Sequence, residues 1–425
     1  MAKKQSNNTH KRNIIVGQSG GPTAVINSSL AGVYKTAKER GFDTVYGMLH
    51  GIQGFLDEQY VDLSTQIHSD MDIELLKRTP SAFLGSCRFK LPEIHEDLEF
   101  YERIFQILDR LEIEAFIYIG GNDSMDTIKK LSDYAIVKGH TQKFLGVPKT
   151  IDNDLALTDH TPGFGSAAKY IAASTKEVIR DCLGLSYHKK SITILEVMGR
   201  NAGWLTGATA LAKTEECEGP DLIYLPEIAF DIDKFLATVK ELLEKKDTLI
   251  IAVSEGITLA DGRYVCELSG DNASVDPFGH RQLQGTATYL AHFLHSELGH
   301  KTRGFEFSTL QRSASHISSR VDIDEAFMVG GAAVKAADEG DTGKMVVIDR
   351  ISDDPYMSSA GIYDVHRIAN NERFVPREWV NEDGNYVTEE FINYVEPLIQ
   401  GDYQPFMVNG LPQHLVLDQN KIKQP

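Results

Sequence analysis

The chain has 425 residues, of which 42% are hydrophobic and 24% charged, and its 43 basic and 61 acidic residues give a formal charge of -18. This length predicts two or three domains with sizeable cores, because a domain usually holds roughly 100 to 200 residues. The hydrophobic fraction excludes a disordered chain, and the acidic charge excludes a general nucleic-acid binder, which needs a basic surface.

The ends of the chain and its cysteines indicate a cytoplasmic protein. Residues 1–11 are polar and basic, so we expect a disordered tail there and no signal peptide. Cys87, Cys182, Cys217 and Cys266 are far apart and form no C-x-x-C pair, so we expect reduced thiols. No apolar run approaches the roughly 18 residues needed to cross a bilayer, and we expect no membrane partner.

Alternating strand and helix signals predict a doubly wound α/β architecture. Short apolar runs that end in glycine or a turn, typical of strands buried on both faces of a parallel sheet, recur at 14–21, 115–123, 144–154, 191–200 and 248–256. Between them, apolar residues at helical spacing predict helices over 98–111 and 235–243. From about 355 the chain is rich in proline and aromatic residues and is predicted to be an irregular extension. Ligands of such sheets bind at the carboxyl ends of the strands.

The segment GQSGG at 17–21 follows the first predicted strand and precedes a helix-like stretch. It matches G-x-S-x-G, the nucleophile elbow of serine hydrolases, with Ser19 as the nucleophile. It also suits a glycine-rich loop whose N–H groups hold phosphate at a helix N-terminus, or a plain tight turn. The elbow is the weakest of the three interpretations, because it normally follows earlier strands and Ser19 stands on the first.

Two more polar loops follow buried strands. The loop IGGNDSMD at 119–126 combines paired glycines, which let phosphate approach the backbone, with polar side chains that can reach phosphate or its metal ion. The loop PKTIDND at 148–154 places Asp152 and Asp154 beside Lys149, which suits a proton acceptor, its partner and a cation for phosphate. The alternative for both loops is a solvated turn.

Further charged residues stand at later strand ends. Arg200 ends the run 191–200 and Glu255 ends the run 248–256, where they suit a phosphate and sugar hydroxyls. Arg303 and Arg312 flank GFEFSTLQ, and either one taken alone is more readily explained as a surface residue. The segment at 163–168 matches the dinucleotide fingerprint G-x-G-x-x-A, but no strand precedes it, so we exclude that function.

Taken together, these segments resemble the phosphofructokinase family from about residue 13 to 400. The resemblance rests on GGPTAVIN, LGSCRF, GGNDS, PKTIDND, EVMGRNAGWL, PEI, SEG and TRGFEFSTLQR, which follow one another in family order. It implies two doubly wound, Rossmann-like domains: residues 12–160 with about 311–360 for the phosphoryl donor, and 161–310 for fructose 6-phosphate. A C-terminal extension follows over about 361–425.

The resemblance also implies transfer of a phosphoryl group to the 1-hydroxyl of fructose 6-phosphate, giving fructose 1,6-bisphosphate, with Mg²⁺. Asp152 matches the catalytic base, Asp154 its partner, and Lys149 and Arg200 join them as catalytic residues. The sugar phosphate is implied to bind to Thr150, Ile151, Asp152, Lys190, Met198, Gly199, Arg200, Glu255, Arg303, Thr309 and Arg312. The donor is implied to bind to Gly20, Gly21, Arg88, Gly121, Asn122, Asp123, Ser124 and Lys149.

Two positions select the donor within the family. ATP-using members carry glycine where this chain has Asp123 and Lys149, and this pair resembles the pyrophosphate-dependent subgroup. A carboxylate at 123 repels the α-phosphate of a nucleotide, and an ammonium at 149 neutralises a short donor. The alternative donor is ATP, and a serine hydrolase remains the alternative of a different class. Asn122 and Asp123 match the magnesium position, where an amide in place of aspartate favours coordination by pyrophosphate and water.

The resemblance carries three more expectations. The reaction is expected to be reversible and to serve both glycolysis and gluconeogenesis. Thr309 stands where many relatives have histidine or tyrosine, and Lys190 is adjacent to the position whose side chain reaches into a neighbour's site. That contact implies a homodimer or a higher homo-oligomer. A non-catalytic paralogue is disfavoured by the complete TIDND and MGR motifs and both arginines.

Overall fold

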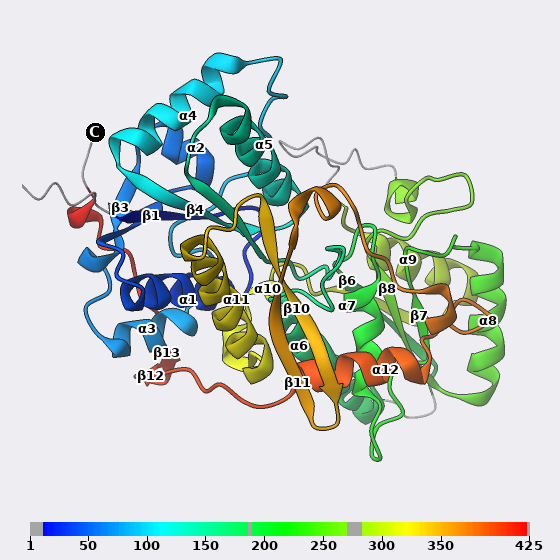
Figure 1. Ribbon diagram of the computed structural model, residues 1–425. Helices are drawn as coiled ribbons and strands as arrows, with labels where there is room; N and C mark the ends of the chain where they lie inside the picture. Colours follow the sequence, from blue (N-terminus) through cyan, green and yellow to red (C-terminus); the bar gives the residue numbers. More distant parts are fainter. Residues whose placement is uncertain (1–11, 186–188, 270–282, 423–425) are drawn as a thin grey trace, which may run out of the picture.

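Two β-sheets organise the chain in the computed structural model, which describes residues 12–185, 189–269 and 283–422 (Figure 1). The predicted disordered tail at 1–11 lies outside the described residues. Each sheet is flanked by helices on both faces, so the predicted α/β fold with two doubly wound layers is confirmed.

The first sheet has seven strands in the order β11-β10-β5-β4-β1-β2-β3. Its central strands are parallel, while β3 and β11 pair antiparallel at the two edges. The strands are β1 (Asn13–Gln18), β2 (Thr44–Met48), β3 (Tyr60–Asp62), β4 (Ile113–Gly120), β5 (Lys143–Pro148), β10 (Lys344–Asp353) and β11 (Tyr356–Asp364). The strands predicted at 14–21, 115–123 and 144–154 are confirmed, and each ends where its glycine-rich or polar loop begins.

Helices cover the first sheet on both faces because successive side chains of a strand point to opposite sides. Ile14 and Val16 pack in one core with α1 (Ile26–Glu39), α3 (Asp70–Lys77) and α11 (Arg320–Asp338). Ile15, between them, packs in the other core with α2 (Gly51–Leu56), α4 (Leu98–Arg110) and α5 (Asn122–Lys138). The helix predicted at 98–111 is therefore confirmed as α4.

The second sheet has four parallel strands in the order β7-β8-β6-β9. They are β6 (Ser191–Val197), β7 (Leu222–Tyr224), β8 (Thr248–Ser254) and β9 (Lys301–Glu306). One face packs on α8 (Ile232–Lys245) and α9 (Thr286–Leu298), and the other on α6 (Phe164–Leu185), α7 (Trp204–Gly207) and α12 (Glu389–Val395). The short helix α10 (Leu310–Ser313) follows β9. The strands predicted at 191–200 and 248–256 and the helix at 235–243 are confirmed.

The C-terminal segment crosses from the first sheet to the second. After β11 it forms short turns, α12 and a small hairpin of β12 (Met407–Val408) and β13 (Leu411–Pro412) (Figure 1). Phe391, Val395 and Leu398 are fully buried in the core of the second sheet. The segment that the sequence marks as an irregular extension is thus an integral part of that core.

The excluded dinucleotide fingerprint at 163–168 begins α6, and a loop precedes it. The buried carboxylate of Asp322 accepts hydrogen bonds from the backbone N–H groups of Gly163 (2.8 Å) and Ser166 (2.9 Å). A protein carboxylate therefore occupies the helix N-terminus at which a pyrophosphate would bind. Across the described residues, none of the helices is long and apolar enough to cross a membrane.

Candidate active site

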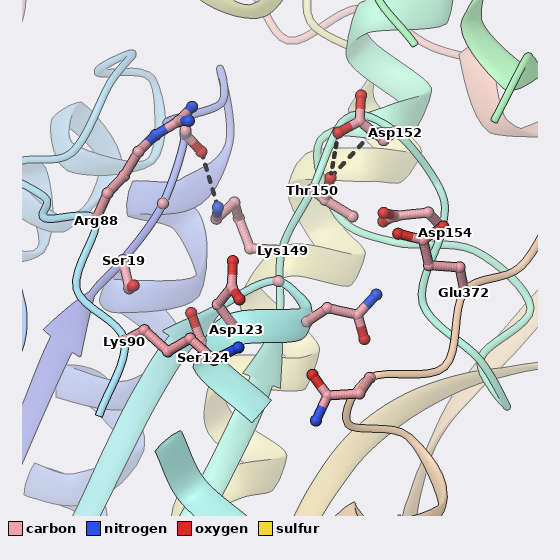
Figure 2. Close-up of a pocket in the computed structure, with 15 residues that line it drawn as sticks. Ser19, Arg88, Lys90, Asp123, Ser124, Lys149, Thr150, Asp152, Asp154 and Glu372 are labelled. Atoms are coloured by element: carbon pink, nitrogen blue, oxygen red, sulfur yellow. Dashed lines mark hydrogen bonds between the residues drawn. The ribbon is translucent and has the colours of Figure 1, made fainter. Parts of the chain in front are cut away.

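Three adjoining cavities lie at the carboxyl ends of the strands, as predicted. Cavity A, of about 570 Å³, is lined by the loops that follow β1, β4 and β5 (Figure 2). Cavity B, of about 290 Å³, shares Lys149, Asp152 and Asp154 with cavity A. Cavity C, of about 440 Å³, shares Arg200 and Arg312 with cavity B and reaches β9. Arg88 lines all three, so together they form one continuous site between the two sheets.

The GQSGG loop brings cations against its own backbone. A side chain at Gly20, whose φ is +77°, would meet Lys149 Nζ at 3.1 Å, and one at Gly21 would meet Arg312 Nη1 at 3.1 Å. Lys149 Nζ donates to the carbonyl oxygen of Gly21 at 2.8 Å. The absence of side chains at these two glycines is what lets the cations converge there, and the arrangement suits a polyanionic ligand.

Lys149 is nearly inaccessible to solvent, with 3% of its surface exposed. Burial lowers the pKa of its ammonium to about 8, against the opposing attraction of Asp152 and Asp154, and the nearby Arg88 and Arg312 lower it further. An anionic ligand beside a buried ammonium stabilises its charged form and raises its pKa again. Lys149 is therefore suited to bind an anion.

The TIDND loop presents two carboxylates to cavities A and B. The Thr150 hydroxyl accepts from Asp152 N at 3.0 Å and donates to Asp152 Oδ2 at 3.3 Å, which orients the carboxylate. Burial raises the pKa of Asp152 above its ordinary value, although Lys149 opposes the rise. Burial, together with the charges of Asp152 and Glu372, raises the pKa of Asp154 to about 7. Asp152 is therefore a carboxylate held ready to accept a proton.

The GGNDS loop forms the first turn of α5, whose N-terminus faces cavity A. Asp123 and Ser124 line the cavity. Both amide atoms of Asn122 are buried and make no hydrogen bond within the described residues. No group of three His, Cys, Asp or Glu side chains among the described residues is arranged to hold a metal ion. A cation here therefore fits a site in which Asn122 and Asp123 contribute only part of the coordination.

The MGR loop and Glu255 form the wall shared by cavities B and C. Met198 N donates to Gln311 Oε1 at 3.2 Å, which joins this loop to the short helix after β9. Gly199 N donates to Glu255 Oε1 at 3.5 Å. Burial, with the charges of Asp152 and Glu196, raises the pKa of Glu255 to about 8. Arg200 and Arg312 supply positive charge beside this carboxyl, so the wall can bind a phosphate and hydroxyls together.

Most of the predicted site residues meet in these cavities. Cavity A is lined by Gly20, Gly21, Arg88, Gly121, Asn122, Asp123, Ser124, Lys149, Thr150, Asp152 and Asp154, and cavities B and C add Ile151, Met198, Arg200, Glu255, Thr309 and Arg312. Gly199 contributes its backbone N–H to Glu255. Two predicted residues lie elsewhere. Lys190 precedes β6 at the opposite end of the sheet and donates to the carbonyl oxygen of Leu243, and Arg303 lies on β9 without lining any of the three cavities.

The sequence-based prediction missed two residues of the C-terminal segment. Asn370 lines cavity A, and Glu372 lines both A and B, where Figure 2 shows its side chain beside Asp154. Asn201 Nδ2 donates to the Glu372 carboxylate at 3.2 Å. Neither residue follows an apolar run or belongs to a motif, and more than 200 residues of sequence separate them from the TIDND loop. Lys90, two positions after Arg88, was also missed.

Ser19 lines cavity A, but its surroundings do not form a hydrolase triad. Within the described part of the chain, the residues lining the three cavities include no histidine that could act as its base. A serine without such a base is a weak nucleophile. The serine-hydrolase alternative therefore lacks its essential partner.

Comparisons with known proteins agree with this geometry. The family model for phosphofructokinase matches residues 13–336. A pyrophosphate–fructose 6-phosphate 1-phosphotransferase of Halomonas elongata is 40% identical over 97% of this chain and 98% of its own. A second pyrophosphate–fructose 6-phosphate 1-phosphotransferase, from Xanthomonas campestris pv. campestris, is 41% identical over 95% of this chain and 96% of its own. The crystal structure of a pyrophosphate-dependent phosphofructokinase from Nitrosospira multiformis superposes with a TM-score of 0.87, at 38% identity over 97% of this chain and 98% of its own.

Proposed function

Because the chain belongs to the phosphofructokinase family, we propose that it transfers a phosphoryl group from pyrophosphate to the 1-hydroxyl of fructose 6-phosphate. The products are fructose 1,6-bisphosphate and phosphate, and the enzyme class is diphosphate–fructose-6-phosphate 1-phosphotransferase. The observation that carries this proposal is the joint presence of Asp123 and Lys149 in cavity A.

These two residues favour pyrophosphate over ATP for a physical reason. Asp123 puts negative charge and volume in the cavity, which penalises the third phosphate and the nucleoside of ATP. The buried ammonium of Lys149 lies against the backbone of Gly21. In this proposal the second phosphate of pyrophosphate binds there, and the ammonium neutralises its charge. A site that attracts two phosphate groups and repels a third phosphate group favours pyrophosphate over ATP. ATP is the alternative donor that the experiment below tests.

In the proposed step, the Asp152 carboxylate accepts the proton of the sugar 1-hydroxyl. The hydroxyl oxygen forms a bond to the nearer phosphorus of pyrophosphate, and the bond from that phosphorus to the bridging oxygen breaks. The electron pair leaves with the departing phosphate, whose charge Lys149 neutralises. Arg200, at the wall shared by cavities B and C, assists the transferred group. Such reactions depend mainly on positioning and charge neutralisation, and both are built into the cavities.

We propose Mg²⁺ as the cofactor, which Asn122 and Asp123 would help to hold together with the bound donor. The amide of Asn122, which is buried and has no hydrogen-bond partner in the part of the chain that the structure describes, supports this assignment. A bound Mg²⁺ would neutralise part of the negative charge of the phosphates. Asp154 is the partner of Asp152, whose charge adds to the effect of burial in raising the pKa of Asp154 to about 7.

We also propose a cytoplasmic homodimer or higher homo-oligomer that runs the reaction reversibly in glycolysis and gluconeogenesis. Cys87, Cys182 and Cys217 are free and buried thiols, which suits a reducing compartment. Lys190, directly before β6, and Arg303, on the neighbouring strand β9, line none of the three cavities of their own chain, which suits a role across an interface.

The test of the function is a comparison of two donors. Purified enzyme, fructose 6-phosphate and Mg²⁺ are incubated with pyrophosphate in one reaction and ATP in another, and fructose 1,6-bisphosphate is measured over time. We expect turnover with pyrophosphate and little with ATP. A clear preference for ATP would reassign the donor, and no product with either donor would reject the function.

A further inference from the structure

The hydroxyl of Tyr394 connects the C-terminal segment to the TIDND loop. Tyr394 lies on α12, more than 230 residues after the loop, and only 8% of its surface is exposed. Its Oη accepts from Asn153 Nδ2 at 2.9 Å and from Arg373 Nη1 at 3.3 Å, and donates to the carbonyl oxygen of Asp159 at 2.6 Å. A phenol has one donor and two acceptor positions, so all three positions of this hydroxyl are occupied, and one of them is taken by the TIDND loop.

Asn153 is the residue that shapes the loop. It stands between Asp152 and Asp154, is completely buried, and has a left-handed backbone with φ of +55°. This conformation is disfavoured for residues other than glycine unless surrounding contacts hold it. Its two amide atoms provide those contacts, because Oδ1 accepts from Thr161 N at 3.1 Å while Nδ2 donates to Tyr394. The turn that separates the two carboxylates is therefore held through a side chain of the C-terminal segment.

Besides Thr161, two more partners of this turn come from the same segment as Tyr394. Arg373 N donates to the carbonyl oxygen of Asp154 at 2.8 Å, and Leu155 pairs with Glu372. The Tyr394 ring cannot easily move, since it packs against Trp204 and Trp379 with ring centroids 5.3 Å from each. Its guanidinium neighbour Arg350 lies 4.7 Å from the ring centre. The segment thus presents a hydroxyl fixed by its ring packing to the turn between the two carboxylates, and adds to the support that Thr161 gives this turn.

We propose that Tyr394 is a positioning residue for phosphoryl transfer, which acts through Asn153 to fix Asp152 and Asp154 in the site. This inference rests on the proposed function, because it assigns the loop's carboxylates to the transfer step. In this proposal the C-terminal segment contributes to catalysis without contacting the substrates. Its tyrosine supports the catalytic loop, and the residues that line the cavities bind the substrates.

The test is Tyr394→Phe, which keeps the ring packing and removes only the hydroxyl. We expect kcat with pyrophosphate to fall by about 10- to 100-fold, the effect of a small misplacement of a catalytic group. We expect KM for both substrates to change by less than about threefold, because the cavity residues that bind them are unaltered. A tyrosine with a merely structural role would lower the unfolding temperature and leave kcat unchanged.

Two more variants complete the experiment. Tyr403→Phe is the matched control, since it removes a hydroxyl bonded to Glu74 Oε2 at 2.6 Å, in the same segment but outside the three cavities. We expect its kcat to match the wild type. Asn153→Gly tests the link from the loop side, because glycine adopts the same φ without the amide. It should lower kcat as Tyr394→Phe does, and the double variant should be no slower than the slower single variant.

The inference is overturned if Tyr394→Phe keeps kcat within about twofold of the wild type, or if the two single losses multiply in the double variant. If Tyr394→Phe does not fold, Asn153→Gly decides alone, and wild-type kcat in that variant overturns the inference. A wild-type enzyme that makes no product from pyrophosphate would instead reject the proposed function, so the two failures are distinguishable.

Discussion

The buried ammonium of Lys149 makes the rate of the enzyme depend on pH in a specific way. Its pKa is lowered from 10.5 to about 8, chiefly by burial. At 1.36 kcal/mol per pKa unit, this corresponds to about 3 kcal/mol against the charged form. A neutral amine cannot attract pyrophosphate. The competent fraction of free enzyme therefore halves at about pH 8 and falls about tenfold for each further pH unit, and kcat/KM should follow it.

Lys149→Arg is the perturbation that isolates this group. A guanidinium has a pKa above about 12 and stays charged throughout the range. We expect the variant to be slower than the wild type at pH 7, because the longer side chain misplaces the charge, but to lose the alkaline decline. Lys149→Met should lower kcat/KM at pH 7 by roughly 10²- to 10³-fold, the usual cost of removing one preorganised charge.

The measurement is kcat/KM for pyrophosphate between pH 6 and 10, with fructose 1,6-bisphosphate determined in quenched samples so that no coupling enzyme limits the range. Ionisation of pyrophosphate itself is common to both proteins and cancels in the comparison. The reasoning is refuted if the wild type shows no decline from pH 7 to 9, or if Lys149→Arg declines in parallel with it.

Three further predictions concern the base, the donor and stability. Asp152→Asn should lower kcat at least about 100-fold by removing the proton acceptor, and near-normal turnover would reject that role. Asp123→Gly, alone and with Lys149→Gly, should gain measurable turnover with ATP, and no gain in either variant would show that donor choice lies elsewhere. His160 is buried between Glu325 and Asp159, which raise its pKa to about 9 against the effect of burial. Because this pKa lies above the ordinary 6.5, its stabilisation is complete below pH 6.5 and is lost as pH rises through about 9. In urea unfolding, the wild type should lose about 3 kcal/mol more than His160→Gln over that interval, and equal losses would contradict the assignment.

Three of the seven strands of the first sheet, β1, β4 and β5, and the loops that follow them in cavity A could be predicted from local sequence. Apolar runs such as 115–123 and 144–154 must be buried on both faces, and the chain has to turn where they end. The loops at those ends carry Gly121, Asp123 and Lys149, and parallel strands bring their carboxyl ends to one edge. Because the strands are adjacent and parallel, loops that are separate in the sequence lie side by side and form one site.

Other residues could not be predicted this way, because nothing in their own neighbourhood marks them. Glu372 and Tyr394 lie in a proline-rich segment without periodicity, and their place beside the TIDND loop depends on how α12 packs in the second core. Lys190 shows the opposite case. It is adjacent to a family position whose side chain reaches into a neighbour's site, and within its own chain it lies at the far end of β6 from the MGR loop.

The sequence by itself determined the α/β class and the family, and it is the source of the proposals for the donor and the catalytic loop, because each depends on short stretches whose chemistry is local. The tertiary structure decided how deeply the residues of those stretches are buried and which distant side chains contact them. The ammonium of Lys149 and the carboxyl of Asp154 have shifted pKa values chiefly because the fold buries them, and a distant tyrosine helps to hold the left-handed turn at Asn153. Burial and long-range hydrogen bonds arise from the packing of the whole chain, and no segment carries them alone.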